Sequence, residues 1–285
     1  MEQVNIILKI QSAYNQFTKA ERKVADYCLA HREDVLFLSI TDLAEACSVG
    51  EASVFRFCRT LELGGYQEFK MQMSLCQNLA GMEERMSQSG GQGEEEKQGL
   101  AERVLRVHQQ AVNETAQFLK EEELEHFLDQ LDQAKRIYFF GISDSLLAAQ
   151  EARNKFLRVT DKTICVEDPH LMAVTATMMR PGDFLVIVSY SGATRDVIEI
   201  AKLAKEAGAK VGALTHYRKS PLTDASDAVL LCGGQEGPMD RGSLAAKAGM
   251  LYLVDLLYQG YYERNEGQCR KNKEKAIAAV VDKTY

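Results

Sequence analysis

Hydroxyl groups cluster in one short stretch, residues 189–194, where they could bind an anion. The stretch follows an unbroken apolar run, residues 184–188, which is typical of a parallel strand covered on both faces. From Arg195 onward, apolar residues recur with helical spacing. Loops between a parallel strand and a helix bind ligands in open α/β sheets, and the free N–H groups of a helix start favour an anion. The candidate ligand-binding residues here are Ser189, Ser191, Gly192 and Thr194.

This chemistry suits the phosphate of a small polar molecule. Hydroxyls are neutral hydrogen-bond donors, and a glycine lets the backbone approach a ligand closely. A purely structural interpretation is also open, in which Thr194 or Ser191 serves only as the N-cap of the helix that follows. Serine and threonine are common before helices, so the stretch alone does not separate the two interpretations.

Composition narrows the classes of protein that fit. A length of 285 residues suggests about two domains, and no apolar run approaches the ~18 residues of a membrane span. The N-terminus lacks the pattern of a signal peptide, and seven scattered cysteines without a CxxC pair fit reduced thiols, so a cytoplasmic protein is expected. The five histidines are also scattered, and neither a metal site nor a cofactor is predicted. The net charge of −7 argues weakly against a nucleic-acid partner.

The first eighty residues predict a helical domain with a helix-turn-helix. A capping box begins a helix at Thr18, and a second, short helix opens at Ser39. A four-residue break at 47–50 separates this second helix from one over 51–61. In this motif the second helix enters the major groove of DNA by its N-terminal residues. Arg59 is expected nearer the DNA backbone. The candidate DNA-binding residues are Glu51, Ala52, Ser53, Arg56 and Arg59.

A plain helical bundle with solvated arginines explains the same pattern. Residues 1–80 hold eight Lys and Arg against ten Asp and Glu, so this region has no overall basic footprint. Any DNA-binding surface would have to be basic only locally.

The remainder of the chain predicts a linker and then an α/β domain. Residues 81–99 are rich in Gly, Ser, Gln and Glu and predict a flexible linker, and helices over 100–119 and 121–134 form an arm before the first strand. Strands and helices then alternate, which predicts a five-stranded parallel sheet flanked by helices. No GxGxxG or Walker motif is present, which argues against dinucleotide and ATP sites. The predicted strands are 136–140, 163–166, 184–188, 210–215 and 228–231.

The N-terminal motifs resemble the helix-turn-helix domain of RpiR-type bacterial transcription regulators. The resemblance covers nearly all of residues 1–80, and it rests on 17–27, 39–46, 52–59 and 65–70. One departure lies in the turn, where the family usually has Gly-Val-Ser and this chain has Ser48-Val49-Gly50. Ser48 would then hold a left-handed position at some strain, and Gly50 would replace a serine N-cap. A phosphate contact that the family makes through the cap serine would be lost or pass to Ser53.

The C-terminal motifs resemble a SIS (sugar isomerase) domain, the phosphosugar-binding module usually joined to RpiR-type domains. The resemblance covers about residues 125–260 and rests on 141–145, 155–156, 189–194 and 208–222. It implies a sugar or phosphate contact for Ser145, and phosphate contacts for the hydroxyls of 189–194. Lys247 falls near a position where the family often carries an arginine facing the site. Ser143 stands where the family has a second glycine, which implies a narrower approach and a change in the sugar bound.

The sequence therefore predicts an α + α/β protein with a helix-turn-helix domain over 1–80, a linker over 81–99 and a SIS domain with its helical arm over 100–285. The predicted function is regulation of transcription in sugar metabolism, with a double-stranded DNA operator and a phosphosugar effector as partners, no catalytic residues and no membrane. A homodimer or homotetramer is expected, since symmetric operators need two DNA-binding domains. The candidate oligomer surfaces are 244–257 and 100–119, although the former could equally be a core face.

Two alternatives stay open. A phosphosugar isomerase or lyase would need a general base, and acidic or imidazole groups lie near predicted strand ends. A partner protein that binds with another regulator without reading DNA itself would have a silent recognition helix. The N-terminal domain, which an isomerase would not need, decides in favour of the regulator. The candidate bases of the enzyme alternative are Glu167, Asp168, His170, His216 and Glu236.

Overall fold

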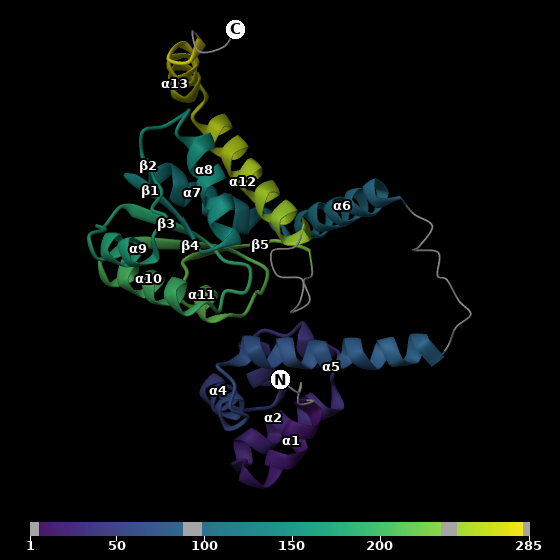
Figure 1. Cartoon of the computed structure of the whole chain (residues 1–285). Coiled ribbons are helices and arrows are strands. Elements are labelled where there is room, and N and C mark those ends of the chain that lie inside the picture. Colours follow the sequence, from purple (N-terminus) through teal and green to yellow (C-terminus); the bar gives the residue numbers. More distant parts are fainter. Residues whose placement is uncertain (1–5, 88–98, 235–243, 282–285) are drawn as a thin grey trace. The chain divides into compact units, whose positions relative to one another are not determined.

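A computed structural model describes residues 6–87, 99–234 and 244–281 of the chain. These residues form two compact units, and the division falls within one helix, between Leu105 and Arg106. The first unit is all-helical and the second contains a parallel sheet with helices on both faces (Figure 1). The predicted α + α/β fold class is confirmed. No helix of the described residues is long and apolar enough to cross a membrane.

The helical unit contains the predicted capping box at Thr18 and a second one at Ser39. The hydroxyls of Thr18 and Ser39 accept hydrogen bonds from the backbone three residues on, and Glu21 and Asp42 return the contact. A first helix, which the sequence analysis did not predict, precedes them, and the last helix continues to Ser87 into the predicted linker. The helices are α1 (Ile6–Ala13), α2 (Lys19–Ala30), α3 (Ile40–Ala46), α4 (Glu51–Thr60) and α5 (Tyr66–Ser87), with 3₁₀ turns at Tyr14–Gln16 and Asp34–Leu36.

Aromatic rings hold α4 against its neighbours. Phe57 of α4 is fully buried, and its ring lies 5.1 Å from that of Phe17 and 5.3 Å from that of Phe69 in α5. Val54 and Cys58 bury the same side of α4. One side of α4 is thereby committed to the core, and the opposite side is left to solvent.

The turn between α3 and α4 has the strained geometry that its sequence predicts. Ser48 has a φ of 51°, and its N–H donates to the carbonyl of Glu45 while the N–H of Val49 donates to that of Ala44. This pair of bonds is the Schellman ending of a helix, which usually has glycine at the left-handed position. Gly50 is the N-cap of α4 and offers no side chain to cap it.

The second unit is built on five parallel strands in the order β2-β1-β3-β4-β5. Four strands lie within a residue of their predicted bounds, and β2 is shorter than predicted because only two of its residues pair with β1. The strands are β1 (Arg136–Gly141), β2 (Thr163–Ile164), β3 (Asp183–Val188), β4 (Lys210–Thr215) and β5 (Ala228–Leu231).

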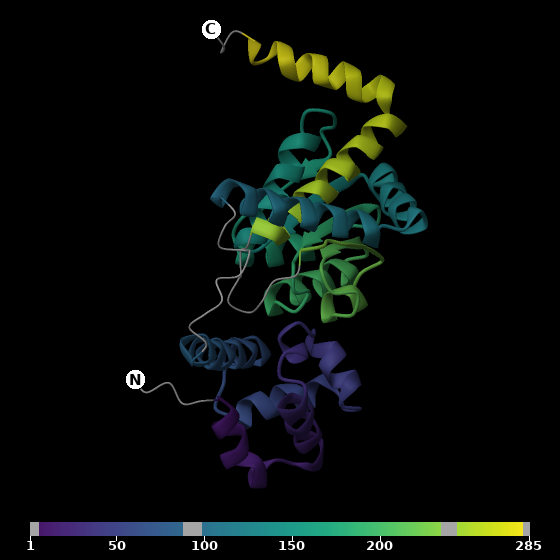
Figure 2. The same cartoon turned by 90° about the vertical axis from the view of Figure 1, so that its right-hand side faces the viewer.

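Helices cover the sheet as two layers. Helices α7, α8 and α12 pack on one face, and α9, α10 and α11 on the other (Figure 1). Helix α6 precedes α7, and α13 follows α12 at an angle and extends beyond the sheet (Figure 2). The helices are α6 (Leu100–Phe118), α7 (Glu121–Gln133), α8 (Asp144–Phe156), α9 (Pro169–Thr177), α10 (Arg195–Glu206), α11 (Pro221–Asp224), α12 (Leu244–Arg264) and α13 (Glu266–Ala278).

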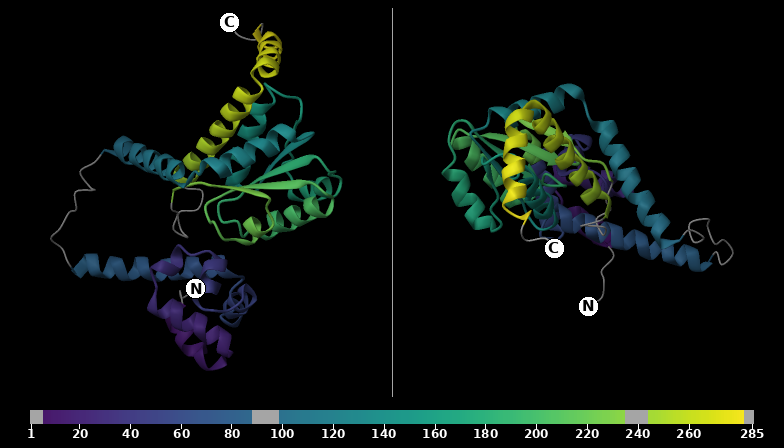
Figure 3. Two further views of the ribbon diagram at one scale, coloured as in Figure 1. Left: turned by 180° about the vertical axis from the view of Figure 1, so that it is seen from behind. Right: turned by 90° about the horizontal axis from the view of Figure 1, so that it is seen from above.

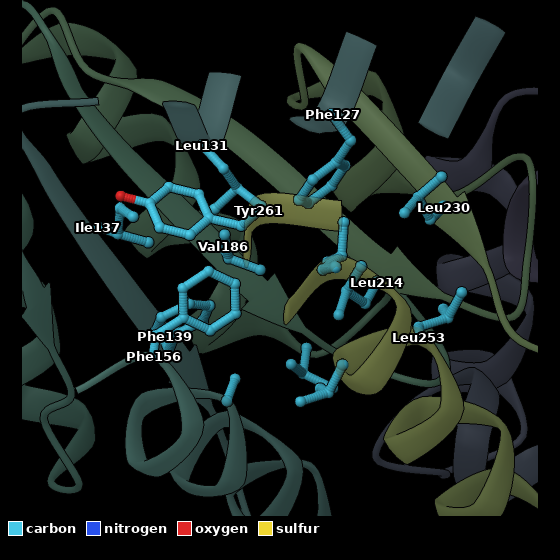
Figure 4. Packing of buried hydrophobic residues seen from close by; sticks show 14 of the residues in the cluster. Phe127, Leu131, Ile137, Phe139, Phe156, Val186, Leu214, Leu230, Leu253 and Tyr261 are labelled. Carbon is cyan, nitrogen blue, oxygen red and sulfur yellow. The ribbon is translucent and has the colours of Figure 1, made fainter. Parts of the chain in front are cut away.

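The larger core lies between the sheet and the layer of α7, α8 and α12 (Figure 4). The rings of Phe127 and Phe184 meet edge to face there, with centroids 5.4 Å apart. Gly212 of β4 makes room for them, since a Cβ at this position would lie 2.6 Å from Phe184 and 2.7 Å from Phe127. The strands alternate, so that Phe139 and Val186 face this core while Phe140 and Ile187 face the other. This packing fixes where the strands end, and so where their loops begin.

Replacing Ser48 by glycine should stabilise the helical unit. The substitution removes the strain of an L-residue at positive φ, about 1–2 kcal/mol, and glycine adds unfolded-state entropy of about 0.4–1 kcal/mol, so a net gain of about 0.5–1 kcal/mol is expected. Denaturant unfolding of the full-length protein measures it. The matched control is Ser12→Gly in the regular helix α1, which should lose stability. Equal losses in both variants would contradict the strain at Ser48.

Candidate functional site

The direction in which successive strands are added to the sheet reverses between β1 and β3. From β1 the chain turns to β2 on one side, and from β3 it continues to β4 and β5 on the other, although β1 and β3 are neighbours. Their last residues, Gly141 and Val188, pair directly across the sheet. The loops after these two strands therefore start side by side. Open α/β sheets bind ligands in the crevice at this kind of switch point.

The loop after β1 carries Ser143 and Ser145. Gly141 lets helix α8 fold closely against the strand end, because a Cβ at this position would lie 2.5 Å from the carbonyl oxygen of Ser145. Ser145 lies half-buried in the first turn of α8. Ser143 is exposed at the N-cap with φ 56° and ψ −128°, and its side chain makes no capping bond. Glycine adopts that backbone conformation readily, so the departure from Gly-x-Gly places strain of about 1–3 kcal/mol beside the candidate site.

The loop after β3 is tightly built. Ser189 is buried, and its N–H donates to the carbonyl of Leu214 at 3.0 Å. Gly192 has a φ of 58°, and a Cβ at this position would lie 2.2 Å from the hydroxyl oxygen of Ser220. Leu222 donates its N–H to the carbonyl of Gly192 at 3.0 Å, which ties the loop to α11. The loop is thus held by β4 and α11, as a preformed binding loop would be.

The first turn of α10 is left without a side-chain cap. Thr194 occupies the N-cap position, but its hydroxyl accepts no hydrogen bond from the helix. The Ser191 hydroxyl accepts only from the N–H of Ala193 at 3.3 Å, within the loop itself. Thr194 is thus the N-cap residue by position, as the structural interpretation expects, but its hydroxyl makes no capping bond to the helix. A bound anion would therefore find the N–H groups of the helix start and the Thr194 hydroxyl in position.

Lys247 lies half-buried in the first turn of α12. Among the described residues, no hydrogen bond or ion pair joins it to the 189–194 loop. Arg218, in the loop after β4, is engaged elsewhere, since it donates to Glu123 at 2.9 Å. Burial would raise the pKa of Glu123, but the hydrogen bonds from Arg218 and Lys120 outweigh it and lower that pKa. The positive charge of Arg218 is thus balanced by a carboxylate.

The candidate general bases are partly committed to the fold. The Asp168 carboxylate caps α9 by accepting from the N–H of Leu171 at 2.9 Å. His216 stacks on Tyr190, with ring centroids 4.8 Å apart, and its Nδ1 lies 2.9 Å from the carbonyl of Cys232. Glu167 and His170 are exposed. Glu236 lies outside the described residues. In the part of the chain that is described, no group of three or more His, Cys, Asp and Glu could hold a metal ion.

On α4 the structure divides the candidate DNA-binding residues into two groups. Glu51 accepts a hydrogen bond of 2.5 Å from the hydroxyl of Thr41, and this bond joins α3 to α4. Ser53 is buried, and its hydroxyl accepts from Arg56 at 3.0 Å. Both side chains therefore have partners within the helical unit. The exposed candidates are Ala52, Arg56 and Arg59.

Phe55 lies at the surface, although its spacing groups it with the apolar residues Val54, Cys58 and Leu61, which are buried. Its side chain is 43% exposed, although the other phenylalanine of α4 is fully buried. The guanidinium carbon of Arg59 lies 5.2 Å from the centroid of its ring, a cation–π contact. Phe55 follows the exposed Ala52 by three residues and precedes Arg59 by four, so these side chains share one face of the helix. An apolar residue among exposed arginines was a signal available in the sequence.

The comparisons with known proteins agree with both units. A family model described as the helix-turn-helix domain of the rpiR family matches residues 4–80, and one described as the SIS domain matches residues 130–258. An HTH-type transcriptional regulator of Caldanaerobacter subterraneus subsp. tengcongensis is 34% identical over 89% of each chain. The transcriptional regulator HexR of Pseudomonas aeruginosa is 33% identical over 78% of this chain and 76% of its own.

A solved structure extends the similarity to nearly the whole chain. The NanR protein of Vibrio vulnificus, complexed with ManNAc-6P, has a TM-score of 0.85 and 29% identity, and the match covers 98% of this chain and 99% of that one. The chain belongs to the rpiR family of helix-turn-helix transcriptional regulators and carries a SIS domain. The resemblance seen in the sequence motifs is confirmed.

Alanine at Gly192 should damage the loop after β3. The positive φ and the 2.2 Å approach of the new Cβ to Ser220 both oppose it, and a loss of about 1–3 kcal/mol in unfolding free energy is expected. The measurement is the thermal midpoint of the full-length protein. Gly267→Ala in α13 is the control, because its new Cβ meets no atom within 4 Å and should cost nothing. A Gly192→Ala protein as stable as the control would show that the loop adapts freely.

Proposed function

We propose that this protein regulates transcription in sugar metabolism and that a phosphosugar bound to its SIS domain controls its binding to DNA. The observation that carries the proposal is the uncapped start of α10 at the switch point, within a chain that also contains a helix-turn-helix unit. The ManNAc-6P bound to the similar NanR protein supports a phosphosugar as the ligand class.

The proposed ligand site combines the two neighbouring loops. Ser189, Ser191 and Thr194 hold the phosphate together with the N–H groups around Gly192 and the helix start. Ser145 contacts the sugar from the loop after β1, and Lys247 adds a positive charge from α12. Hydroxyls and backbone donors suit a phosphate that is exchanged rather than permanently held, because they bind it without a full ion pair.

The proposed DNA surface is the exposed stripe of α4. Arg56 and Arg59 would reach bases and phosphates, while Ala52 and Phe55 present apolar groups suited to thymine methyls. Glu51 and Ser53 act from within, by fixing α4 on α3 and by orienting Arg56. This division of roles gives a locally basic face on a unit that is not basic overall.

A homodimer or homotetramer is the proposed assembly, because half-sites on DNA sit about one helical turn apart and require paired recognition helices. The proposed domain division remains 1–80, 81–99 and 100–285, with the difference that helix α5 extends to Ser87. Because DNA is the proposed target, the proposed location is the cytoplasm.

The relatives reported above are named transcriptional regulators, and we propose that the chain has no isomerase or lyase activity. Asp168 caps α9, and His216 is hydrogen-bonded to Cys232 and stacked on Tyr190, contacts that support structural roles for both residues. Turnover of a phosphosugar by the purified protein would restore the enzyme alternative.

A thermal-shift screen tests the ligand site. ManNAc-6P and other sugar phosphates are each compared with the unphosphorylated sugar, and a ligand at 100 times its Kd should stabilise by about 2.7 kcal/mol. Ser191→Ala should weaken binding about tenfold or more, the usual value of a hydrogen bond to a charged group, without unfolding the protein. Thr177→Ala, at the far end of α9, is the control. Equal titrations of all three proteins would remove Ser191 from the site.

Arg56→Ala tests the DNA surface. The probe is the sequence that the full-length protein selects from a random duplex library, and binding is measured by fluorescence anisotropy. Loss of a base contact is expected to weaken binding by about 1–3 kcal/mol and to relax the selected sequence at one position. Arg270→Ala in α13 changes the charge equally but lies outside α4 and should bind normally. Wild-type affinity of the Arg56→Ala protein would show that Arg56 does not contact a DNA base.

A further inference from the structure

Tyr190, which lies between Ser189 and Ser191, makes several contacts outside the 189–194 loop. Tyr190 accepts hydrogen bonds at its carbonyl from the hydroxyl of Thr215 at 3.1 Å and from the N–H of His216 at 3.0 Å. Its ring stacks on His216, and its hydroxyl donates to the carbonyl of Gly234 at 2.9 Å. The side chain of one loop residue thus connects the carboxyl end of β3 with the segment that follows β5.

Gly233 and Gly234, in the segment that follows β5, also contact helix α6. The N–H of Gly233 donates to the hydroxyl of Thr115, and the N–H of Gly234 donates to the carboxylate of Glu114, both at 2.8 Å. A Cβ on Gly233 would lie 2.4 Å from the Cβ of Glu114, and one on Gly234 would lie 2.8 Å from the backbone of Ala245. These two glycines, together with Gly249 of α12, allow α6 and α12 to approach the end of β5 this closely (Figure 3).

Helix α6 has few other buried attachments. Ala111 and Thr115 are its only buried residues, and the Thr115 hydroxyl, besides accepting from Gly233, donates to the carbonyl of Ala111 at 2.7 Å. Phe118, at the end of the helix, meets the edge of His216 with centroids 6.4 Å apart. Glu114 and Phe118 thus contact the two groups that Tyr190 also contacts, Gly234 and His216, and Thr115 contacts the neighbouring Gly233.

We propose that Tyr190 is the positioning residue through which the ligand loop controls the arm helix α6. The hydroxyl of Tyr190 is hydrogen-bonded to the carbonyl of Gly234, and the carboxylate of Glu114 to the N–H of the same residue. A displacement of either side chain is therefore resisted by the hydrogen bond of the other. A phosphate bound by the hydroxyls of Ser189 and Ser191, the two neighbours of Tyr190, shifts the Tyr190 side chain while the loop backbone stays tied to β4 and α11. Hydrogen bonds in such a buried network strengthen one another, so loosening one weakens the rest.

The ligand-free protein gives the first test. Tyr190→Phe keeps the ring on His216 and removes only the hydroxyl bond to Gly234. Hydrogen exchange of the full-length protein should speed up at residues 106–118 and 233–234 by roughly three- to tenfold, the effect of one lost hydrogen bond. Tyr258→Phe removes a hydroxyl from α12 of the same unit and should leave these amides unchanged. Identical exchange in the two variants would overturn the proposal.

A double-mutant cycle separates coupling from simple packing. Tyr190→Phe and Glu114→Ala act on one residue, so their effects on the exchange of α6 should be clearly non-additive. Strict additivity would mean that the two hydrogen bonds are independent. The proposed control of α6 by Tyr190 would then be wrong even if each variant alone loosened the helix.

The ligand-dependent test rests on the proposed function. Tyr190→Phe should bind ManNAc-6P within about threefold of wild type by calorimetry, since the ring and the loop hydroxyls remain. The change that ManNAc-6P causes in α6 exchange and in DNA affinity should be lost in this variant and retained in Tyr258→Phe. A wild-type response in Tyr190→Phe would overturn the proposed control of α6 by Tyr190. If the wild-type protein binds no phosphosugar, the proposed function is wrong. The hydrogen-exchange experiment and the double-mutant cycle on the ligand-free protein still test the coupling of Tyr190 to α6.

Discussion

The adjacency of β1 and β3 is the constraint on which the rest of the second unit depends. Because the chain leaves these strands in opposite directions, no crossover covers the space between their carboxyl ends. Apolar packing on both faces fixes the register that pairs Gly141 with Val188. Two loops that carry hydroxyls then start side by side. The position of the candidate site is therefore set by the order of the strands, and its side chains add the chemistry.

Two serines occupy backbone conformations that suit glycine, and both lie beside a candidate functional surface. Ser48 follows α3 ahead of α4, and Ser143 precedes α8 beside the candidate ligand loops. The packing around each turn outweighs the strain, because the Schellman bonds form at Ser48 and α8 starts directly after Ser143. Departures from a family motif at such positions change local stability and the space open to a ligand more than they change the fold.

The sequence predicted the strands well because buried parallel strands are short, continuous apolar runs with clear ends. It missed α1, whose run Ile6-Ile7-Leu8 is ambiguous between strand and helix, and it ended α5 early at Gly81, although the residues 82–86 are strong helix formers. The hydroxyl loop and the exposed Arg56 were found from pattern. The partnership of Glu51 with Thr41, the burial of Ser53 and the reach of Tyr190 to Gly234 were not, because each depends on side chains brought together only by folding.

Helix α6 is a stiff rod fixed at one end. Leu100 precedes Glu114 by fourteen residues, which at 1.5 Å per residue is about 21 Å of continuous helix. A tilt of about 10° at the glycine pair would therefore sweep the far end of the helix through about 4 Å, far more than any atom at the glycines would move. Amplification of this kind needs length and rigidity rather than strong forces, and under the proposed control by Tyr190 it would carry a small displacement at the phosphate loop to the start of the arm.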